Sequence, residues 1–291
     1  MDHAFRVMGV LNVTPDSFSD GGQFLDAAAA VAQGCALVDE GADVVDVGGE
    51  STRPGAEPVS IADELARVRP VLEGLAAAGL PAHAQISIDT CKAPVARAAL
   101  DAGATLVNDV SALRADPDMA AVVADGGADC CLMHMLGEPR TMQRDPRYED
   151  VVDEVKAFLE ERLLFAVHEG ISERRVLLDP GIGFGKTLEH NLTLLRRLDE
   201  LTSIGRPIVV GTSRKSFLGA IAARAAGASE PPDVQDRLAG TIATNVLALE
   251  RGASVFRVHD VAPVRDALAV AAATLDGRWT ARRTGTRTRT I

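Results

Sequence analysis

The sequence predicts a single-domain (β/α)8 barrel of the α/β class, and three observations support this prediction. Eight short apolar runs recur along the 291 residues, and segments of helical character separate them. Near-continuous apolar strands of this kind are typical of a parallel sheet whose outer face is covered by helices. An open, doubly wound sheet is the competing architecture. Eight repeats over about 270 residues, without a G-x-G-x-x-G after the first strand, favour the closed barrel.

The predicted strands are short, and most of them end at a polar residue. They are residues 7–11, 44–47, 86–88, 105–107, 130–133, 176–178, 208–210 and 254–258. Helices are predicted over residues 27–40, 61–78, 95–102, 148–169, 188–200 and 238–251, and a shorter helix from Lys215 precedes a loop over residues 225–236. Candidate N-caps are Asp26, Ser60 and Asp116. Candidate helix stops are Gly41, Gly79 and Gly170.

Composition argues against several classes of partner. A formal net charge of −11 is unfavourable for nucleic acid or an anionic membrane surface. No apolar run approaches the roughly 18 residues of a membrane span, and the first residues lack the pattern of a signal peptide. The four cysteines form no C-x-x-C, which indicates free thiols in a reducing compartment. We therefore expect a cytoplasmic protein, with a domain over residues 1–277 and a disordered Arg/Thr-rich tail over residues 278–291, rather than a basic anchor.

Polar side chains collect at the carboxyl ends of the predicted strands, where barrel enzymes place their active sites. These ends carry Asn12, Asp89, Asn108, Asp179, Lys215, Arg257 and His259. A single polar residue after a strand can equally cap a helix or close a turn, and Asp179-Pro180-Gly181 has the composition of a turn. That interpretation weakens when most strands end in this way, because one rim then gathers both hydrogen-bond acceptors and cations. The sequence therefore predicts an active site at this rim.

Three further segments indicate binding of an anion at the same rim. Residues 47–55 combine small residues, two hydroxyls and Arg53 in a loop. Residues 213–216 open a helix directly after the seventh strand, where free N–H groups favour a carboxylate or a phosphate. Arg257 and His259 alternate along the eighth strand, so both face one side and need an anionic partner, or form an ion pair at the barrel mouth.

Other chemistries find little support in the sequence. Residues 179–187 are not a nucleotide-binding P-loop, because the first glycine of that motif would fall on Pro180. There is no H-E-x-x-H and no cluster of Cys and His, which argues against a zinc site. A Ser-His-Asp triad is also unsupported, since the chain has no G-x-S-x-G elbow.

Taken together, these motifs resemble those of the dihydropteroate synthases, a family of pterin-binding enzymes of the folate pathway. The matching stretches, in family order, are residues 8–22 (MGVLNVTPDSFSDGG), 46–55 (DVGGESTRPG), 86–90 (ISIDT), 107–111 (VNDVS), 133–135 (MHM), 179–186 (DPGIGFGK), 213–219 (SRKSFLG) and 257–260 (RVHD). The resemblance implies condensation of (7,8-dihydropterin-6-yl)methyl diphosphate with 4-aminobenzoate, with Mg²⁺ as the cofactor. It also implies competition by sulfonamides and a homodimer.

The resemblance also implies a role for particular residues. Asp179 would hold the amino edge of the pterin, with Asn108, Asp89 and Lys215 completing its hydrogen bonds and Met133 and Val110 forming apolar walls. The diphosphate would contact Arg257, His259, Asn12, Thr52 and Arg53, with Asn12 near the metal. The catalytic set would be Asp89, Asp179, Lys215 and Arg257.

The aminobenzoate ring would lie between Phe184 and the Lys215 stem, with its carboxylate near Ser216. Gly211 completes the implied substrate-binding set, and Pro15, Asp16, Ser17, Phe18 and Pro54 would form a lid. Two alternatives remain at this stage: a pterin-binding methyltransferase and a non-catalytic pterin-binding homologue. The methyltransferase has no use for Arg257, His259 and the Ser-Arg-Lys helix start, and no rim cation or lid motif is missing here, as it would be in a non-catalytic relative.

Overall fold

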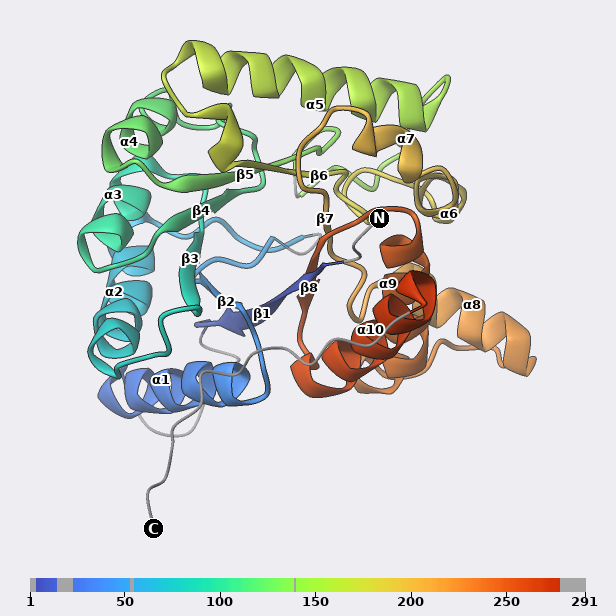
Figure 1. Ribbon diagram of the computed structural model, residues 1–291, viewed down its shortest axis with the longest axis horizontal. Helices are drawn as coiled ribbons and strands as arrows, with labels where there is room; N and C mark the ends of the chain where they lie inside the picture. Colours follow the sequence, from blue (N-terminus) through green and yellow to red (C-terminus); the bar gives the residue numbers. More distant parts are fainter. Residues whose placement is uncertain (1–3, 15–22, 53–54, 139, 278–291) are drawn as a thin grey trace.

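Eight parallel strands form the centre of the molecule, with helices around them (Figure 1). This computed structural model describes residues 4–14, 23–52, 55–138 and 140–277. The strands are β1 (Arg6–Asn12), β2 (Val44–Gly48), β3 (Gln85–Asp89), β4 (Leu106–Asp109), β5 (Asp129–Met133), β6 (Val176–Asp179), β7 (Val209–Val210) and β8 (Val255–Val258). They pair in the order β6-β5-β4-β3-β2-β1-β8-β7, and a parallel bridge between Leu178 and Ile208 joins the two ends. The predicted (β/α)8 barrel is confirmed.

The helices cover the outside of this barrel. They are α1 (Gln23–Asp39), α2 (Ile61–Ala77), α3 (Ala93–Asp101), α4 (Met119–Gly126), α5 (Val151–His168), α6 (Leu188–Arg196), α7 (Asp199–Thr202), α8 (Ser216–Ala226), α9 (Leu238–Glu250) and α10 (Val261–Asp276), with 3-10 turns η2 (Glu173–Arg175) and η3 (Val234–Arg237). The main core lies between the two layers, where outward strand residues such as Val45, Ile88 and Val107 belong to one buried cluster with Leu72 and Leu159 of the helices. Helices on the outer face explain why the strands are apolar throughout.

Inside the barrel the side chains form layers. One apolar layer takes a buried residue from each of seven strands: Met8, Val44, Leu106, Cys131, Leu177, Val209 and Val255. Because side chains alternate along a strand, the residue two positions later points into the same interior, one step nearer the carboxyl end. That step leads to Val10, Asp46, Asn108, Met133, Asp179, Gly211 and Arg257, four of which are polar or charged. The interior therefore changes from apolar to polar toward the carboxyl rim.

Several predicted helix boundaries hold, and others do not. Ser60 caps α2, since its Oγ accepts a hydrogen bond from the amide of Asp63 at 3.1 Å. Asp26 is not an N-cap, because α1 begins at Gln23. The α-helix α4 begins at Met119 and not at Pro117, but Asp116 still accepts from the amide of Asp118 at 3.1 Å, as a cap before Pro117 would. Its other carboxylate oxygen accepts from the amide of Ala93 at the start of α3. The helix predicted over residues 188–200 is broken into α6 and α7.

Some predictions fall on residues that the structure does not describe. They are the predicted tail over residues 278–291, the predicted lid residues Pro15, Asp16, Ser17, Phe18 and Pro54, and the predicted diphosphate contact Arg53. In the described part of the chain, no helix combines the length and the apolar character needed to cross a membrane. The limit of the domain at residue 277 stays a prediction, although α10 ends directly before it, at Asp276.

Candidate active site

A fully buried carboxylate, that of Asp46, connects four strands inside the barrel. Its Oδ1 accepts a hydrogen bond from Ser87 Oγ at 2.6 Å. Its Oδ2 accepts from Asn108 Nδ2 at 3.0 Å and from Arg257 Nε at 2.7 Å. These partners lie on β3, β4 and β8, while Asp46 itself lies on β2. A buried charge of this kind is tolerable because each oxygen has a polar partner and one partner is a cation.

Arg257 extends this network to Asp89 at the end of β3. Its Nη2 donates to Asp89 Oδ2 at 2.7 Å. Burial lowers the pKa of Arg257, but the charges of Asp46 and Asp89 more than offset this, so its pKa lies above the ordinary arginine value. Burial raises the pKa of Asp89 to about 7, although the charge of Arg257 acts in the opposite direction. Asp89 thus sits between its neutral and ionised forms near neutral pH, beside a permanent cation.

On the other side of the barrel, Asp179 and Lys215 influence each other's charge. Asp179 ends β6, and its Oδ1 accepts from the amide of Gly181 at 2.7 Å, so the carboxylate does close a turn. Burial raises the pKa of Asp179, and the charge of Lys215 opposes the shift. Loss of water around Lys215 lowers its pKa to about 8, against the influence of Asp179. The Lys215 ammonium donates to the Ile182 carbonyl.

The turn that carries Lys215 is anchored to the residues that directly follow β8. Arg214 has a φ of 61°, in the left-handed region that few non-glycine residues adopt. Its guanidinium donates to both oxygens of Asp260, at 2.6 and 3.0 Å. Next to it, Ser213 Oγ lies 3.0 Å from His259 Nδ1. Lys215 is the N-cap residue of α8 and makes no side-chain cap, so the first amides of that helix remain available for an anion.

An apolar wall stands beside these polar groups. Val110, Met133, Met135 and Met142 form a small buried cluster, and Phe184 packs against it. Lys215 Nζ lies 4.6 Å from the centroid of the Phe184 ring, which is cation–π geometry. The wall thus combines methionine, valine and aromatic surface, as a flat aromatic ligand requires.

Of the remaining predicted residues, Asn12 ends β1 and pairs in register with Gly48, whereas Thr52 follows β2 and is half-buried. Ser216 is the first residue of α8 and is exposed. Gly211 lies against Arg257, because a Cβ at this glycine would meet Arg257 Cβ at 3.8 Å. All of these positions belong to the carboxyl rim of the barrel.

The sequence-based prediction missed Asp46 as a site residue, and it also missed the buried pair His134 and Lys186. In the sequence, Asp46 is the first residue of the matching stretch over residues 46–55, and no role was assigned to it. Its position two residues after Val44, a residue of the apolar layer, is the signal that could have found it. His134 directly follows the fifth predicted strand and Lys186 ends the matching stretch over residues 179–186, but neither pattern indicates that the two side chains meet.

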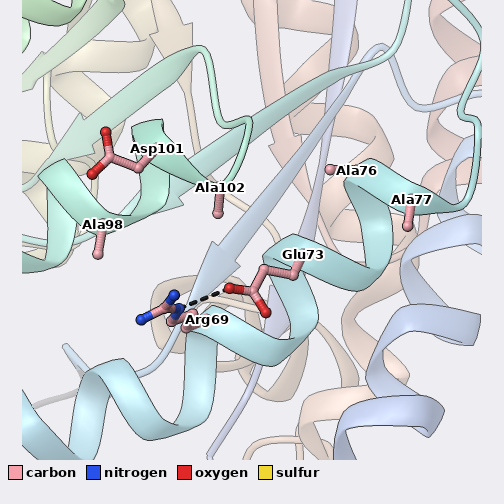
Figure 2. Close-up of a pocket in the computed structure, with 7 residues that line it drawn as sticks. All are labelled: Arg69, Glu73, Ala76, Ala77, Ala98, Asp101 and Ala102. Carbon is pink, nitrogen blue, oxygen red and sulfur yellow. Dashed lines mark hydrogen bonds and ion pairs between the residues drawn. The ribbon is translucent and has the colours of Figure 1, made fainter.

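A surface groove lies between α2 and α3, away from this rim (Figure 2). Its lining residues are Arg69, Glu73, Ala76, Ala77, Ala98, Asp101 and Ala102. Arg69 and Glu73 form an exposed ion pair at 2.7 Å, one helical turn apart. Most of the lining comes from the C-terminal halves of the two helices, and these halves lie toward the amino ends of the parallel strands. The groove is therefore separate from the candidate active site.

Comparison with known proteins agrees with this geometry. The family described as "Pterin binding enzyme" matches residues 8–259. A dihydropteroate synthase from Mycobacterium leprae is 50% identical over 272 residues, which are 93% of each chain. The chain belongs to the dihydropteroate synthase family. The resemblance found in the motifs is thereby confirmed.

Solved structures of dihydropteroate synthases share the whole fold with this family member. The Xanthomonas albilineans enzyme with 4-aminobenzoic acid is 47% identical, covers 93% of both chains and superposes with a TM-score of 0.84. The Yersinia pestis enzyme in a sulfonamide complex is 41% identical, with a TM-score of 0.86 over 95% of this chain and 96% of that chain.

Proposed function

We propose that this chain condenses (7,8-dihydropterin-6-yl)methyl diphosphate with 4-aminobenzoate, releasing diphosphate and forming 7,8-dihydropteroate. One observation carries the proposal: Arg257, Asp46, Asp89 and Asn108 form one hydrogen-bonded network at the rim that also holds Asp179 and Lys215. Acidic and amide groups suit a polar heterocycle, and the cations suit its diphosphate. The relatives are named dihydropteroate synthases, and this name supports the same reaction for the chain.

Recognition of the pterin is assigned to Asp179, Asn108, Asp89 and Lys215. A pterin edge presents an amino group beside a ring N–H, and a carboxylate accepts from both. Asp179 Oδ1 already accepts a hydrogen bond from the amide of Gly181, while Oδ2 accepts none from the described residues. Asp179 is 7% exposed, and a bound pterin would supply the donor for Oδ2. Val110 and Met133 would contact the faces of the ring.

Stabilisation of the leaving diphosphate is assigned to Arg257 and His259, together with Asn12, Thr52 and Arg53. The Arg257 guanidinium has five N–H donors, and the two carboxylates of the described network use Nε and Nη2. The others can donate to phosphate oxygens without any reorientation of the side chain. Loss of diphosphate leaves a methylene cation that the dihydropterin ring delocalises, so catalysis consists mainly of stabilising charge on the leaving group. The aromatic amine is neutral at pH 7 and needs no strong base.

Mg²⁺ is the proposed cofactor, and Asn12 is its proposed protein ligand. Within the described residues, no group of three or more His, Cys, Asp or Glu side chains could hold a metal ion. A single amide oxygen fits Mg²⁺ in this setting, because Mg²⁺ keeps several waters and usually binds through substrate phosphates and one or two protein oxygens. When bound, the ion would neutralise charge on the diphosphate.

The second substrate is assigned to the surface formed by Phe184, Lys215 and Ser216. The 4-aminobenzoate ring would enter between the Phe184 ring and the Lys215 stem, with its carboxylate at the N-terminus of α8. Because Lys215 Nζ lies 4.6 Å from the Phe184 centroid, the lysine side chain would have to move aside for the ring. Residues 15–18 and Pro54 would close over it as a lid. Sulfonamides imitate 4-aminobenzoate and would compete here. A homodimer and a cytoplasmic location remain predictions.

The test is incubation of the purified protein with the pterin diphosphate, Mg²⁺ and labelled 4-aminobenzoate. The intact protein should form labelled 7,8-dihydropteroate, and Asp179→Ala and Lys215→Ala should form far less because each removes a pterin contact. Circular dichroism of both variants would establish that they fold. Absence of labelled product from the intact protein would overturn the proposed function.

A further inference from the structure

Lys186 is a buried lysine that the proposed chemistry leaves without a role. Only 2% of it is exposed. Its Nζ lies 2.9 Å from the carbonyl oxygen of Phe184, 2.9 Å from Nδ1 of His134 and 3.5 Å from the carbonyl oxygen of His134. Burial lowers the pKa of Lys186 well below the ordinary lysine value, and Nζ carries N–H donors in either protonation state. These acceptors belong to two different segments, because His134 directly follows β5 and Phe184 lies in the turn after β6. Lys186 therefore joins two neighbouring rim loops.

The imidazole of His134 is itself held in place. Its ring packs edge-on against Phe158 of α5, with centroids 4.8 Å apart. Burial lowers the pKa of His134 to about 2, and the charge of Lys186 acts in the same direction, so the ring is neutral and its Nδ1 can accept a hydrogen bond. A helix of the outer layer thus orients the acceptor to which Lys186 binds.

The same nitrogen of Lys186 also contacts the backbone of Phe184. Phe184 is half-buried, its ring lies 4.6 Å from the Lys215 ammonium, and it packs against the cluster that contains Val110 and Met133. The Phe184 backbone carbonyl is the acceptor that Lys186 binds. From the contacts of Lys186 with His134 and with the Phe184 carbonyl, we propose that Lys186 is a positioning residue for the second substrate. It holds in place the Phe184 ring against which 4-aminobenzoate stacks. This inference rests on the proposed function.

The rest of the turn has anchors of its own. Tyr148 Oη donates to the Gly185 carbonyl at 2.8 Å, and Gln143 Nε2 donates to the Gly183 carbonyl at 2.6 Å. The Gly183 amide donates to Asn191 Oδ1 at 2.7 Å. Replacement of Lys186 should therefore shift Phe184 locally rather than unfold the turn. Asp179, which holds the pterin, is tied to Gly181 by a separate bond and should be unaffected.

The experiment compares Lys186→Met with Tyr148→Phe in the full-length protein. Methionine has a similar length but donates no hydrogen bond, whereas Tyr148→Phe removes one hydrogen bond from the same turn and leaves the Phe184 carbonyl paired. Lys186→Met should raise the KM for 4-aminobenzoate about tenfold, which corresponds to the loss of one or two net hydrogen bonds. The Kd of the pterin diphosphate, measured alone by fluorescence or calorimetry, should stay within about twofold because its contacts are intact. Tyr148→Phe should change neither constant by more than about twofold.

Two results would overturn the inference while the proposed function stands. One is an equal loss of affinity for both substrates in Lys186→Met, and the other is the same selective rise in KM in Tyr148→Phe. If Lys186→Met does not fold, His134→Leu provides a second test, because it removes one hydrogen-bond acceptor of Lys186. This variant should raise the KM for 4-aminobenzoate selectively. An unchanged KM would overturn the inference. An inactive intact protein would instead reject the proposed function, and this inference with it.

Discussion

The guanidinium of Arg257 forms an ion pair with the carboxylate of Asp89 at 2.7 Å, although 168 residues separate the two along the chain. The same guanidinium also binds Asp46 at 2.7 Å. Two carboxylates thus hold one cation in a fixed orientation before any substrate arrives. Preorganised charge of this kind requires no rearrangement during the reaction, which is the main source of electrostatic catalysis.

Arg257→Lys should therefore impair diphosphate departure even though the positive charge remains. Lysine presents a single ammonium in place of a planar fork and cannot bind both carboxylates and a phosphate in the same geometry. We expect kcat/KM for the pterin diphosphate to fall about 100-fold, the size of effect seen on loss of one preorganised donor. Binding of a pterin that lacks the diphosphate serves as the control and should hardly change. Equal weakening of both ligands would show that Arg257 acts on the pterin ring instead.

The shifted pKa values of Asp89 and Lys215 lead us to expect a bell-shaped pH dependence of kcat/KM for the pterin diphosphate. Burial raises the pKa of Asp89 to about 7, and desolvation lowers the pKa of Lys215 to about 8. The productive form has Asp89 ionised to accept from Arg257 and Lys215 protonated to donate. Activity should fall below about pH 7 and above about pH 8, because kcat/KM reports ionisations of the free enzyme. Asp89→Asn should remove the acidic limb of the pH profile, and Lys215→Arg should remove the alkaline limb. If both limbs stay unchanged in these variants, Asp89 and Lys215 do not cause the pH dependence.

The two shifts should affect stability in opposite senses. Asp89 has a higher pKa in the folded protein than its ordinary value of 3.8, so it contributes stability below that pH and loses it as the pH rises through about 7. Lys215 has a folded pKa below its ordinary value of 10.5, so it costs stability below about pH 8, and this cost disappears as the pH rises toward 10.5. In urea unfolding, the stability of the intact protein relative to Asp89→Asn should decrease between pH 5 and pH 7.5. An increase over that interval would reject the raised pKa.

The barrel could be predicted from the sequence because its signals are local. Apolar runs mark strands, and polar residues that end strands must share one rim in any parallel barrel. The partners across the barrel are not local. The sequence predicts that Arg257 faces an anion, but no pattern in it shows which carboxylates of the chain are the partners. The structure identifies them as Asp46 and Asp89. Likewise, 52 residues separate Lys186 from His134, and their contact depends on how two loops pack.

Asp46→Asn should destabilise the fold more than a typical surface substitution. The amide keeps the shape of the carboxylate and can still accept from Arg257, but it removes the fully buried charge that compensates a half-buried guanidinium. Hydrogen bonds to charged groups contribute about 1.5–3 kcal/mol, so we expect a loss of about 2 kcal/mol in the free energy of unfolding. Urea denaturation measures this loss, with Asp145→Asn, an exposed position, as the control. Equal stability of the two variants would show that the Asp46 charge contributes nothing.

Asn12 should set the requirement for Mg²⁺. Removal of divalent ions with a chelator should abolish product formation, and added Mg²⁺ should restore it. Asn12→Ala removes the proposed oxygen ligand and should raise the Mg²⁺ concentration for half-maximal activity about tenfold, whereas Asn12→Asp retains an oxygen and should require less Mg²⁺ than Asn12→Ala. Mg²⁺ titrations that coincide for all three proteins would remove Asn12 from the metal site.

Phe184 should govern both 4-aminobenzoate and sulfonamide binding, because the two ligands present similar aromatic rings to the same surface. The sulfonamide concentration for half-inhibition should rise in proportion to 4-aminobenzoate, as expected for competition. Phe184→Leu keeps apolar contact with Met133 and its cluster but loses the aromatic face, which is worth about 0.5–1.5 kcal/mol beyond burial. The KM for 4-aminobenzoate and the sulfonamide inhibition constant should therefore rise together, by about three- to tenfold. If inhibition does not depend on the 4-aminobenzoate concentration, or only one of the two constants changes, the ligands do not share the Phe184 surface.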